Sequence, residues 1–183
     1  MARLARSTLI GFPHQVTQRG SFNQTVFETE EDYRRYLEYL GDCASRYSVS
    51  IWAYCLMPNH VHYVCVPKTE DGLARTFNTV HMRYSRFLNN RRGVTGRLWK
   101  GRFLSCMLDG PSAFEEVRFI ENNPVRRGLV KQAEDYAWSS ARSHVLGVPD
   151  PILNDGASLG EQIDDWRIYL AGEKDEPTVS RIR

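Results

Sequence analysis

The chain has 183 residues, a formal net charge of +2 and a hydrophobic fraction of 42%. This length suits one well-buried core and is too short for two ordinary domains, so we expect one domain over residues 1–172 and a charged tail over residues 173–183. No segment approaches the ~18 consecutive apolar residues of a membrane span, and the first residues lack the apolar core of a signal peptide. We therefore expect a cytoplasmic protein with no membrane partner.

The first predicted elements are a strand and a helix. The strand is expected around His14 to Thr17. Thr29 is a suitable helix N-cap, because three acidic residues follow it in what would be the first turn. Apolar residues then recur at helical spacing as far as Tyr47. A helix over this segment is therefore expected.

A hairpin is predicted next, over Ser50 to Val66, with its turn at Met57-Pro58-Asn59. His60 opens the second strand of this hairpin, and successive residues of a strand point to opposite faces. His60 and His62 therefore share one face. Two neutral imidazoles so placed can hold one divalent metal ion. Taken alone, such a pair more often marks ordinary polar positions on a half-exposed strand.

The second half of the chain is predicted to add a helix, a strand and another helix. The first of these helices spans about residues 72–88, a basic loop covers 89–96, and the strand covers about 102–108. Ser112 and Glu115 form the capping-box pattern of the last helix. Pro124 is expected to end that helix, because it disfavours helical geometry at Asn123. This order predicts an α+β fold, a ferredoxin-like antiparallel sheet with helices packed on it.

The positive charges are strongly segregated along the chain. No Asp or Glu occurs between Gly72 and Leu108, nor in the first 27 residues, where Arg19 lies. Such segregation favours a polyanionic partner over a merely solvated face. Three aromatic residues, Tyr84, Trp99 and Phe103, are interleaved with the charges, as in surfaces that bind single strands. The basic residues that we expect on a phosphate-binding surface, together with Arg19, are Arg83, Arg86, Arg91, Arg92, Arg97, Lys100 and Arg102.

The helix that begins near Ser112 carries an aromatic residue on its polar side. Val117 and Ile120 belong to its apolar stripe, whereas Phe119 lies about 160° from Val117 at ~100° per residue. Asn123 follows one turn later, so that its amide oxygen and the ring of Phe119 can point to the same place. An amide oxygen is a suitable further ligand for a metal ion that His60 and His62 hold.

Five segments in this order resemble the REP-associated tyrosine transposases, a group of HUH single-strand nucleases with an IS200-like transposase domain. The resemblance covers about residues 3–170. The segments are PHQVTQRG at 13–20, MPNHVHYV at 57–64, GRLWKGRF at 96–103, RFIENNPVRRGLV at 118–130 and DYAWSS at 135–140.

The resemblance implies a ferredoxin-like nuclease in which His60, His62 and Asn123 hold Mg²⁺ or Mn²⁺ against a scissile phosphate. In this family a tyrosine four residues before the asparagine attacks the phosphate and forms a 5′-phosphotyrosine. Covalent storage of the phosphodiester permits rejoining without an external energy source. The matching residue in this chain is Phe119, which has no hydroxyl group.

Tyrosyl transfer by the family's route should therefore be absent, and three explanations remain open. Phe119 is an introduced change, or a natural variant retained for DNA binding, or another group is the nucleophile. Core packing is the better interpretation of the four tyrosines considered for that role, Tyr54, Tyr63, Tyr84 and Tyr136.

We expect a protein that binds a short DNA hairpin and its single-stranded flank. One hypothesis is a metal-dependent enzyme for strand cleavage and rejoining that lacks its nucleophile. The alternative is a non-catalytic hairpin-binding protein derived from a transposase. A structural Zn²⁺ site is disfavoured, because the usual four-ligand thiolate and imidazole pattern is missing. A monomer is favoured over a dimer, and relatives often continue past this point with a further basic segment.

Overall fold

The computed structural model describes residues 8–153 and 163–172. The predicted charged tail, residues 173–183, lies outside the described residues. Within the described part of the chain, no helix is both long and apolar enough to cross a membrane.

Four strands form one antiparallel sheet: β1 (His14–Arg19), β2 (Val49–Met57), β3 (His60–Pro67) and β4 (Leu104–Met107). Their order in the sheet is β2-β3-β1-β4. With one helix between β1 and β2 and another between β3 and β4, this is the predicted ferredoxin-like arrangement. The register places Thr17 opposite His62 and Arg19 opposite His60, so the histidines lie beside the end of the central strand β1.

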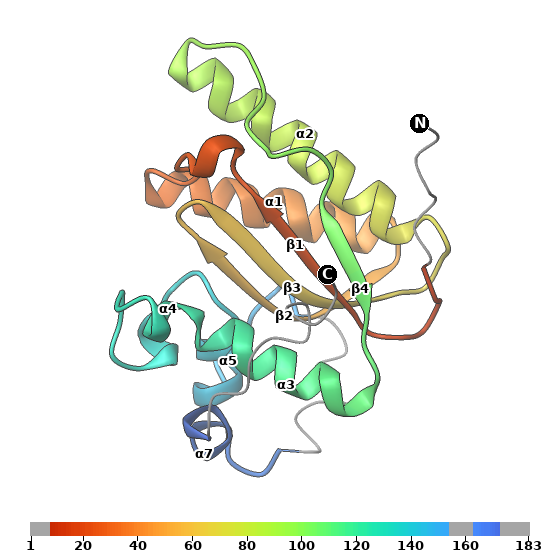
Figure 1. Cartoon of the computed structure of the whole chain (residues 1–183), viewed down its shortest axis with the longest axis vertical. Helices are drawn as coiled ribbons and strands as arrows, with labels where there is room; N and C mark the ends of the chain where they lie inside the picture. Colours follow the sequence, from red (N-terminus) through yellow and green to blue (C-terminus); the bar gives the residue numbers. More distant parts are fainter. Residues whose placement is uncertain (1–7, 154–162, 173–183) are drawn as a thin grey trace.

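Helices α1 (Glu30–Arg46) and α2 (Gly72–Arg92) cover one face of the sheet (Figure 1). Alternate residues of β1 and β3, such as Val16, Val61 and Tyr63, point into the core beneath these helices. Thr29 is the N-cap of α1, as predicted, and forms a capping box with Asp32. Asp32 is fully buried, and its carboxylate accepts the N–H groups of residues 28 and 29 and pairs with Arg91.

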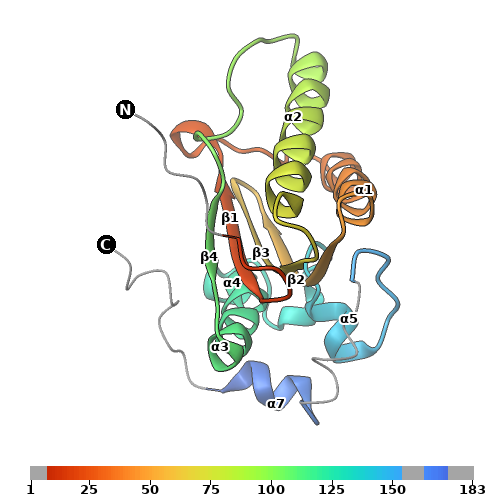
Figure 2. The same cartoon turned by 90° about the vertical axis from the view of Figure 1, so that its right-hand side faces the viewer.

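The other face of the sheet is covered by the segment after β4, which contains α3 (Gly110–Glu121), α4 (Asn123–Arg126), α5 (Ala141–Leu146) and α7 (Trp166–Ala171). Figures 1 and 2 show these helices together, on the side of the sheet away from α1 and α2. Val64 of β3 packs in a second core with Val117 and Ile120 of α3. His60 and His62 share the face of Val64, and they therefore point toward α3.

Three predicted helix boundaries were wrong. Helix α2 continues to Arg92, so the first residues of the predicted loop 89–96 are helical, and the helix ends at Gly93 in left-handed geometry. The N-cap of α3 is Asp109, which accepts the N–H of Ser112, because Pro111 fits the first turn of a helix and moves the start forward. Pro124 does not terminate the helical segment: it occupies the first turn of α4, and Asn123 is helical.

Candidate functional site

His60 and His62 lie at the start of β3 and face the same side, as their spacing predicted. Their ring centroids are 4.9 Å apart and the rings are nearly perpendicular, at 87°. His60 is 5% exposed and His62 is half-buried. The tight turn between β2 and β3 places the side chain of Asn59 beside His60, with Asn59 Oδ1 2.5 Å from His60 Nδ1. This contact fixes the proton on Nδ1 and leaves Nε2 as a lone-pair donor.

Asn123 reaches the same point from the opposite layer. Its Nδ2 atom lies 3.4 Å from His60 Nε2, so the helix asparagine and the strand histidine meet directly. The amide can present its oxygen there instead of its nitrogen after a half-turn, since the two orientations fill the same space. In addition, Nδ1 of His62 is buried without a hydrogen-bond partner among the described residues. Both features suit a site whose remaining partner is a metal ion.

The electrostatics of the site keep both imidazoles neutral near pH 7. Burial lowers the pKa of His60 to about 4, and the positive charges of Arg19 and Arg127 add to this effect. Burial, the neighbouring imidazole and the same arginines lower the pKa of His62 to about 3. Neutral imidazoles are the form that binds metal ions, and the surrounding guanidinium groups favour an anion such as a phosphate.

Phe119 lies beside these groups, at the position where the resemblance implies a tyrosine. Its ring is half-buried and meets the ring of His62 edge-on, with centroids 6.4 Å apart. The guanidinium group of Arg126 lies 3.8 Å above the centre of the Phe119 ring, and Arg126 Nη1 donates a hydrogen bond to the Phe119 carbonyl oxygen at 2.7 Å. Stacking and hydrogen bonding hold this ring in one place.

Four tyrosines considered as other nucleophiles use their hydroxyl groups elsewhere. Tyr63 donates to Tyr36 in the core, at 2.6 Å, and Tyr84 donates to the backbone carbonyl of Val26. Tyr54 donates to Asp150 at 2.7 Å, and Tyr136 donates to the carbonyl of Leu56 at 2.8 Å. Burial raises the pKa of all four. These contacts support the interpretation of all four as structural residues.

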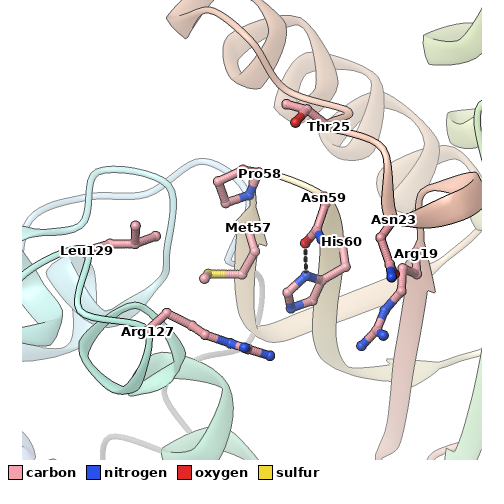
Figure 3. A pocket seen from close by; sticks show the side chains of 9 residues that line it. All are labelled: Arg19, Asn23, Thr25, Met57, Pro58, Asn59, His60, Arg127 and Leu129. Atoms are coloured by element: carbon pink, nitrogen blue, oxygen red, sulfur yellow. Dashed lines mark hydrogen bonds between the residues drawn. The ribbon is translucent and has the colours of Figure 1, made fainter.

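A pocket of about 470 Å³ opens beside His60 (Figure 3). The side chains of Arg19 and Arg127 lie on either side of the imidazole, one from β1 and one from the segment after α4. Both arginines are exposed. The remaining lining residues are Asn23, Thr25, Met57, Pro58, Asn59 and Leu129. A phosphate group in this pocket would meet two positive charges next to the candidate metal ligands.

The predicted DNA-binding residues divide into two groups. In the first group, Arg83 pairs with Asp42, and Arg91 and Arg92 pair with acidic residues at the start of α1. These three arginines connect α1 and α2, on the face of the sheet opposite the histidines. Their charges are already compensated within the protein. The sequence did not reveal these ion pairs, because the acidic partners lie in a different segment of the chain from the arginines.

The second group remains available for a ligand. Arg86, Arg97, Lys100 and Arg102 are exposed and make no ion pair within residues 8–153 and 163–172. Three of them lie in the segment that leads into β4, and this segment is attached to the end of β1. The Lys100 N–H donates to the Arg19 carbonyl at 2.8 Å, and a single bridge joins Gly20 to Trp99. This segment therefore continues the positive surface that begins at Arg19.

The three aromatic residues interleaved with these charges are buried, so their interleaving does not indicate a surface for single strands, whereas the interpretation of Tyr84 as a core residue is confirmed. Tyr84 is fully buried, Phe103 is 2% exposed and Trp99 is 7% exposed. They form part of the core between α2 and the sheet. The three side chains pack in this core, and their rings are not accessible to a bound strand.

Some residues of the site were not identified from the sequence. Arg126 and Arg127 approach the histidines only because α4 turns the chain back over the sheet. A buried pair, Gln15 and Glu116, joins β1 to α3 by a hydrogen bond from the Gln15 side chain to Glu116 Oε1. Burial raises the pKa of Glu116 to about 7. The burial of Glu116 in α3 and of Asn123 in α4 also shows that these two polar side chains are covered by the fold and do not face solvent.

No three His, Cys, Asp or Glu side chains of the described residues are grouped as a metal site. A metal ion at His60 and His62 would therefore need Asn123 as its further protein ligand. This donor set of two nitrogens and one oxygen is compatible with Mg²⁺ or Mn²⁺ and unlike a structural zinc site.

Comparison with known proteins gives one family. Residues 16–123 match the model of a family described as "Transposase IS200 like". A solved structure of a REP-associated tyrosine transposase bound to a REP hairpin is similar in fold, with 19% identity and a TM-score of 0.66 over 85% of this chain and 93% of that one. A putative transposase from Deinococcus radiodurans R1 gives a TM-score of 0.46 at 14% identity, over 66% of this chain and 97% of that one. No curated protein matches the sequence significantly.

Proposed function

Since this chain belongs to the IS200-like transposase family, we propose that it binds a DNA hairpin of the REP type together with its single-stranded flank. We further propose that it retains the phosphate and metal site of a strand-cleaving transposase but lacks the nucleophile. The solved relative with the same fold was bound to a REP hairpin, which supports this choice of ligand. In the proposal the protein is the REP-associated kind of transposase, with tyrosyl cleavage lost.

The observation that carries the proposal is the meeting of His60, His62 and Asn123 beside Phe119. The contact between Asn123 and His60 joins two elements 63 residues apart, and no purely structural need explains two neutral imidazoles there. Mg²⁺ or Mn²⁺ held by these three side chains would neutralise negative charge on a phosphodiester and so favour attack on its phosphorus atom. Arg19 and Arg127 would hold the phosphate beside them, and the Phe119 ring would occupy the place of the attacking group without an oxygen to attack.

The DNA-binding surface would extend from the pocket along the exposed basic residues of the segment before β4. Arg19, Arg97, Lys100 and Arg102 supply charges that are not compensated within the described residues, and phosphate contacts of this kind release counterions. Arg102→Ala should weaken hairpin binding and reduce the slope of log Kd against log salt concentration by about 1. Arg83→Ala is the matched control, because Arg83 is paired with Asp42, and it should leave the salt slope unchanged.

The cleavage test compares the wild-type protein with Phe119→Tyr. Each is incubated with Mn²⁺ and a hairpin oligonucleotide that carries an unpaired flank and a label at its 3′ end, because a 5′-phosphotyrosine retains the 3′ portion of the strand. Denaturing gels are read for cut strand and for protein with covalent label. We expect label on Phe119→Tyr alone, and its loss in the double variant Phe119→Tyr/His62→Ala.

The other outcomes separate the remaining hypotheses. Covalent label on both proteins would reveal a second nucleophile. Label on neither, with binding retained, would favour a hairpin-binding protein whose catalytic geometry has also been lost. Failure of the wild-type protein to bind the hairpin at low salt would refute the proposed function itself.

A further inference from the structure

The turn that follows β1 exposes an aromatic side chain completely. Phe22, in the short helical turn Ser21–Asn23, has a relative exposure of 102%. Among the described residues no other aromatic ring is as exposed, and the next phenylalanine, Phe12, reaches 49%. A side chain so presented makes no contribution to the core, and both faces of its ring are accessible to a ligand.

The backbone of this turn is held in an unfavourable conformation. Phe22 and Asn23 both have positive φ angles, 53° and 58°, in the left-handed region that side chains disfavour. Two consecutive non-glycine residues in this region are unusual, and strain of this kind is concentrated at functional sites. In this conformation the side chain of Phe22 is fully exposed.

The turn is fixed at three points. The Gly20 N–H donates to the Asn59 carbonyl at 2.8 Å, beside the first histidine. The Ser21 N–H and the Gln24 side chain both donate to the Leu98 carbonyl, each at 2.9 Å. Gly20 permits this close packing, since a Cβ atom there would lie 2.5 Å from the Gln24 carbonyl oxygen. Phe22 is therefore presented on a rigid support.

The same turn forms one wall of the basic pocket. Asn23, the neighbour of Phe22, lines the pocket together with Arg19, His60 and Arg127, and Figure 3 shows its side chain close to that of Arg19. Phe22 does not line the pocket itself, but it is the chain neighbour of a residue that does. Single-stranded nucleic acids are bound by this combination of positive charge for the backbone and an aromatic ring for a base.

We propose that Phe22 is a stacking platform for an unpaired nucleobase of a DNA strand whose phosphate occupies the pocket between Arg19 and Arg127. The proposal rests on the proposed function, and it adds the residue that contacts a base. The occupant is a base of the flank and not of the duplex, because paired bases do not offer an open face to a side chain. The contact is tolerant of sequence, since every base has a π-face.

Phe22→Ala should weaken binding of the flanked hairpin by roughly 5- to 150-fold, the effect of one lost base–aromatic stack. The slope of log Kd against log salt should be unchanged, because no charge is removed. Phe22→Trp should restore the affinity. Phe12→Ala is the matched control, because this exposed phenylalanine lies before β1, at the end of the strand away from Arg19.

Two further measurements separate stacking from a structural role. Binding of the same hairpin without its flank should be equal for wild type and Phe22→Ala. A 2-aminopurine base placed in turn at each flank position should show quenching at one position with the wild-type protein, and this quenching should be lost in Phe22→Ala.

The results that would overturn the proposal are distinct from those that refute the proposed function. Tight hairpin binding by the wild-type protein with equal binding by Phe22→Ala would refute stacking alone. A loss of affinity that Phe22→Trp does not restore, or that extends to the flankless hairpin, would also refute it. A change of oligomeric state in Phe22→Ala, measured by sedimentation without DNA, would instead assign the ring to a contact between two copies of the chain.

Discussion

Glu116 provides a quantitative test of the packing between α3 and the central strand. Its carboxyl group is fully buried, accepts a hydrogen bond from Gln15 and has its second oxygen without a partner among the described residues. Burial raises its pKa to about 7, against smaller opposing effects of the Gln15 hydrogen bond and the positive charge of Arg126. Glu116→Gln replaces this group with an uncharged side chain of the same shape.

The expected change in the free energy of unfolding follows from the difference between the pKa of Glu116 in the folded state and in the unfolded state. A glutamate in the unfolded chain titrates near 4.5, so the folded state binds an extra proton between about pH 4.5 and 7. Stability from this group is complete below pH 4.5 and is lost as the pH rises through 7. At 1.36 kcal/mol for each pH unit, the loss is about 3 kcal/mol. Glu116→Gln should match the wild type near pH 4.5 and exceed its free energy of unfolding by about 3 kcal/mol at pH 8.

The assay is urea unfolding of both proteins across this pH range. His60 and His62, whose lowered pKa values make stability rise with pH up to about 6.5, contribute equally to both proteins and cancel in the difference. Glu115→Gln, an exposed position on the same helix, is the control and should track the wild type. The reasoning is refuted if Glu116→Gln is no more stable than the wild type at pH 8.

Three further perturbations test other parts of the structure. Asp32→Ala removes a buried carboxylate that caps α1 and pairs with Arg91. Urea unfolding should show that the free energy of unfolding falls by about 3 kcal/mol. A decrease below about 1 kcal/mol would contradict the assigned role. Gly20→Ala places a Cβ atom 2.5 Å from a backbone oxygen and should destabilise the protein by about 2 kcal/mol, with a matching drop in Tm. Mn²⁺ at about 100 times its Kd should raise the free energy of unfolding of the wild type by about 2.7 kcal/mol, and that of His62→Ala much less. Chelator alone should leave the Tm of the wild type unchanged. Equal stabilisation of both proteins would place the metal elsewhere.

Local patterns were sufficient for the four strands, for α1, α2 and α3, and for one half of the site. The alternation in β3 predicted that His60 and His62 share a face, because side-chain direction in a strand depends only on position. The acidic residues after Thr29 predicted the start of α1 for a similarly local reason. Asn123 was proposed from its place one turn after Phe119 and from the resemblance to a family, and it lies in contact with His60.

Contacts between distant segments were not accessible in this way. Charge counts identified a basic stretch, but they did not reveal that Arg83 and Arg91 pair with acids of α1 while Arg102 stays exposed. The spacing of three aromatic residues among those charges resembled a surface for single strands, but all three rings are buried. Phe22, which is exposed, carried no signal because its presentation depends on a strained turn and its attachments.

The sequence by itself thus determined the order of elements, the face on which the histidines lie and the absence of a hydroxyl group at Phe119. Only the tertiary structure decided which arginines remain available, that Glu116 is buried against Gln15, and that Arg19 and Arg127 converge on His60. The physical reason is that periodicity and capping act over a few residues. Burial, ion pairing and pocket formation depend instead on which surfaces α3 and α4 cover when they fold back onto the sheet.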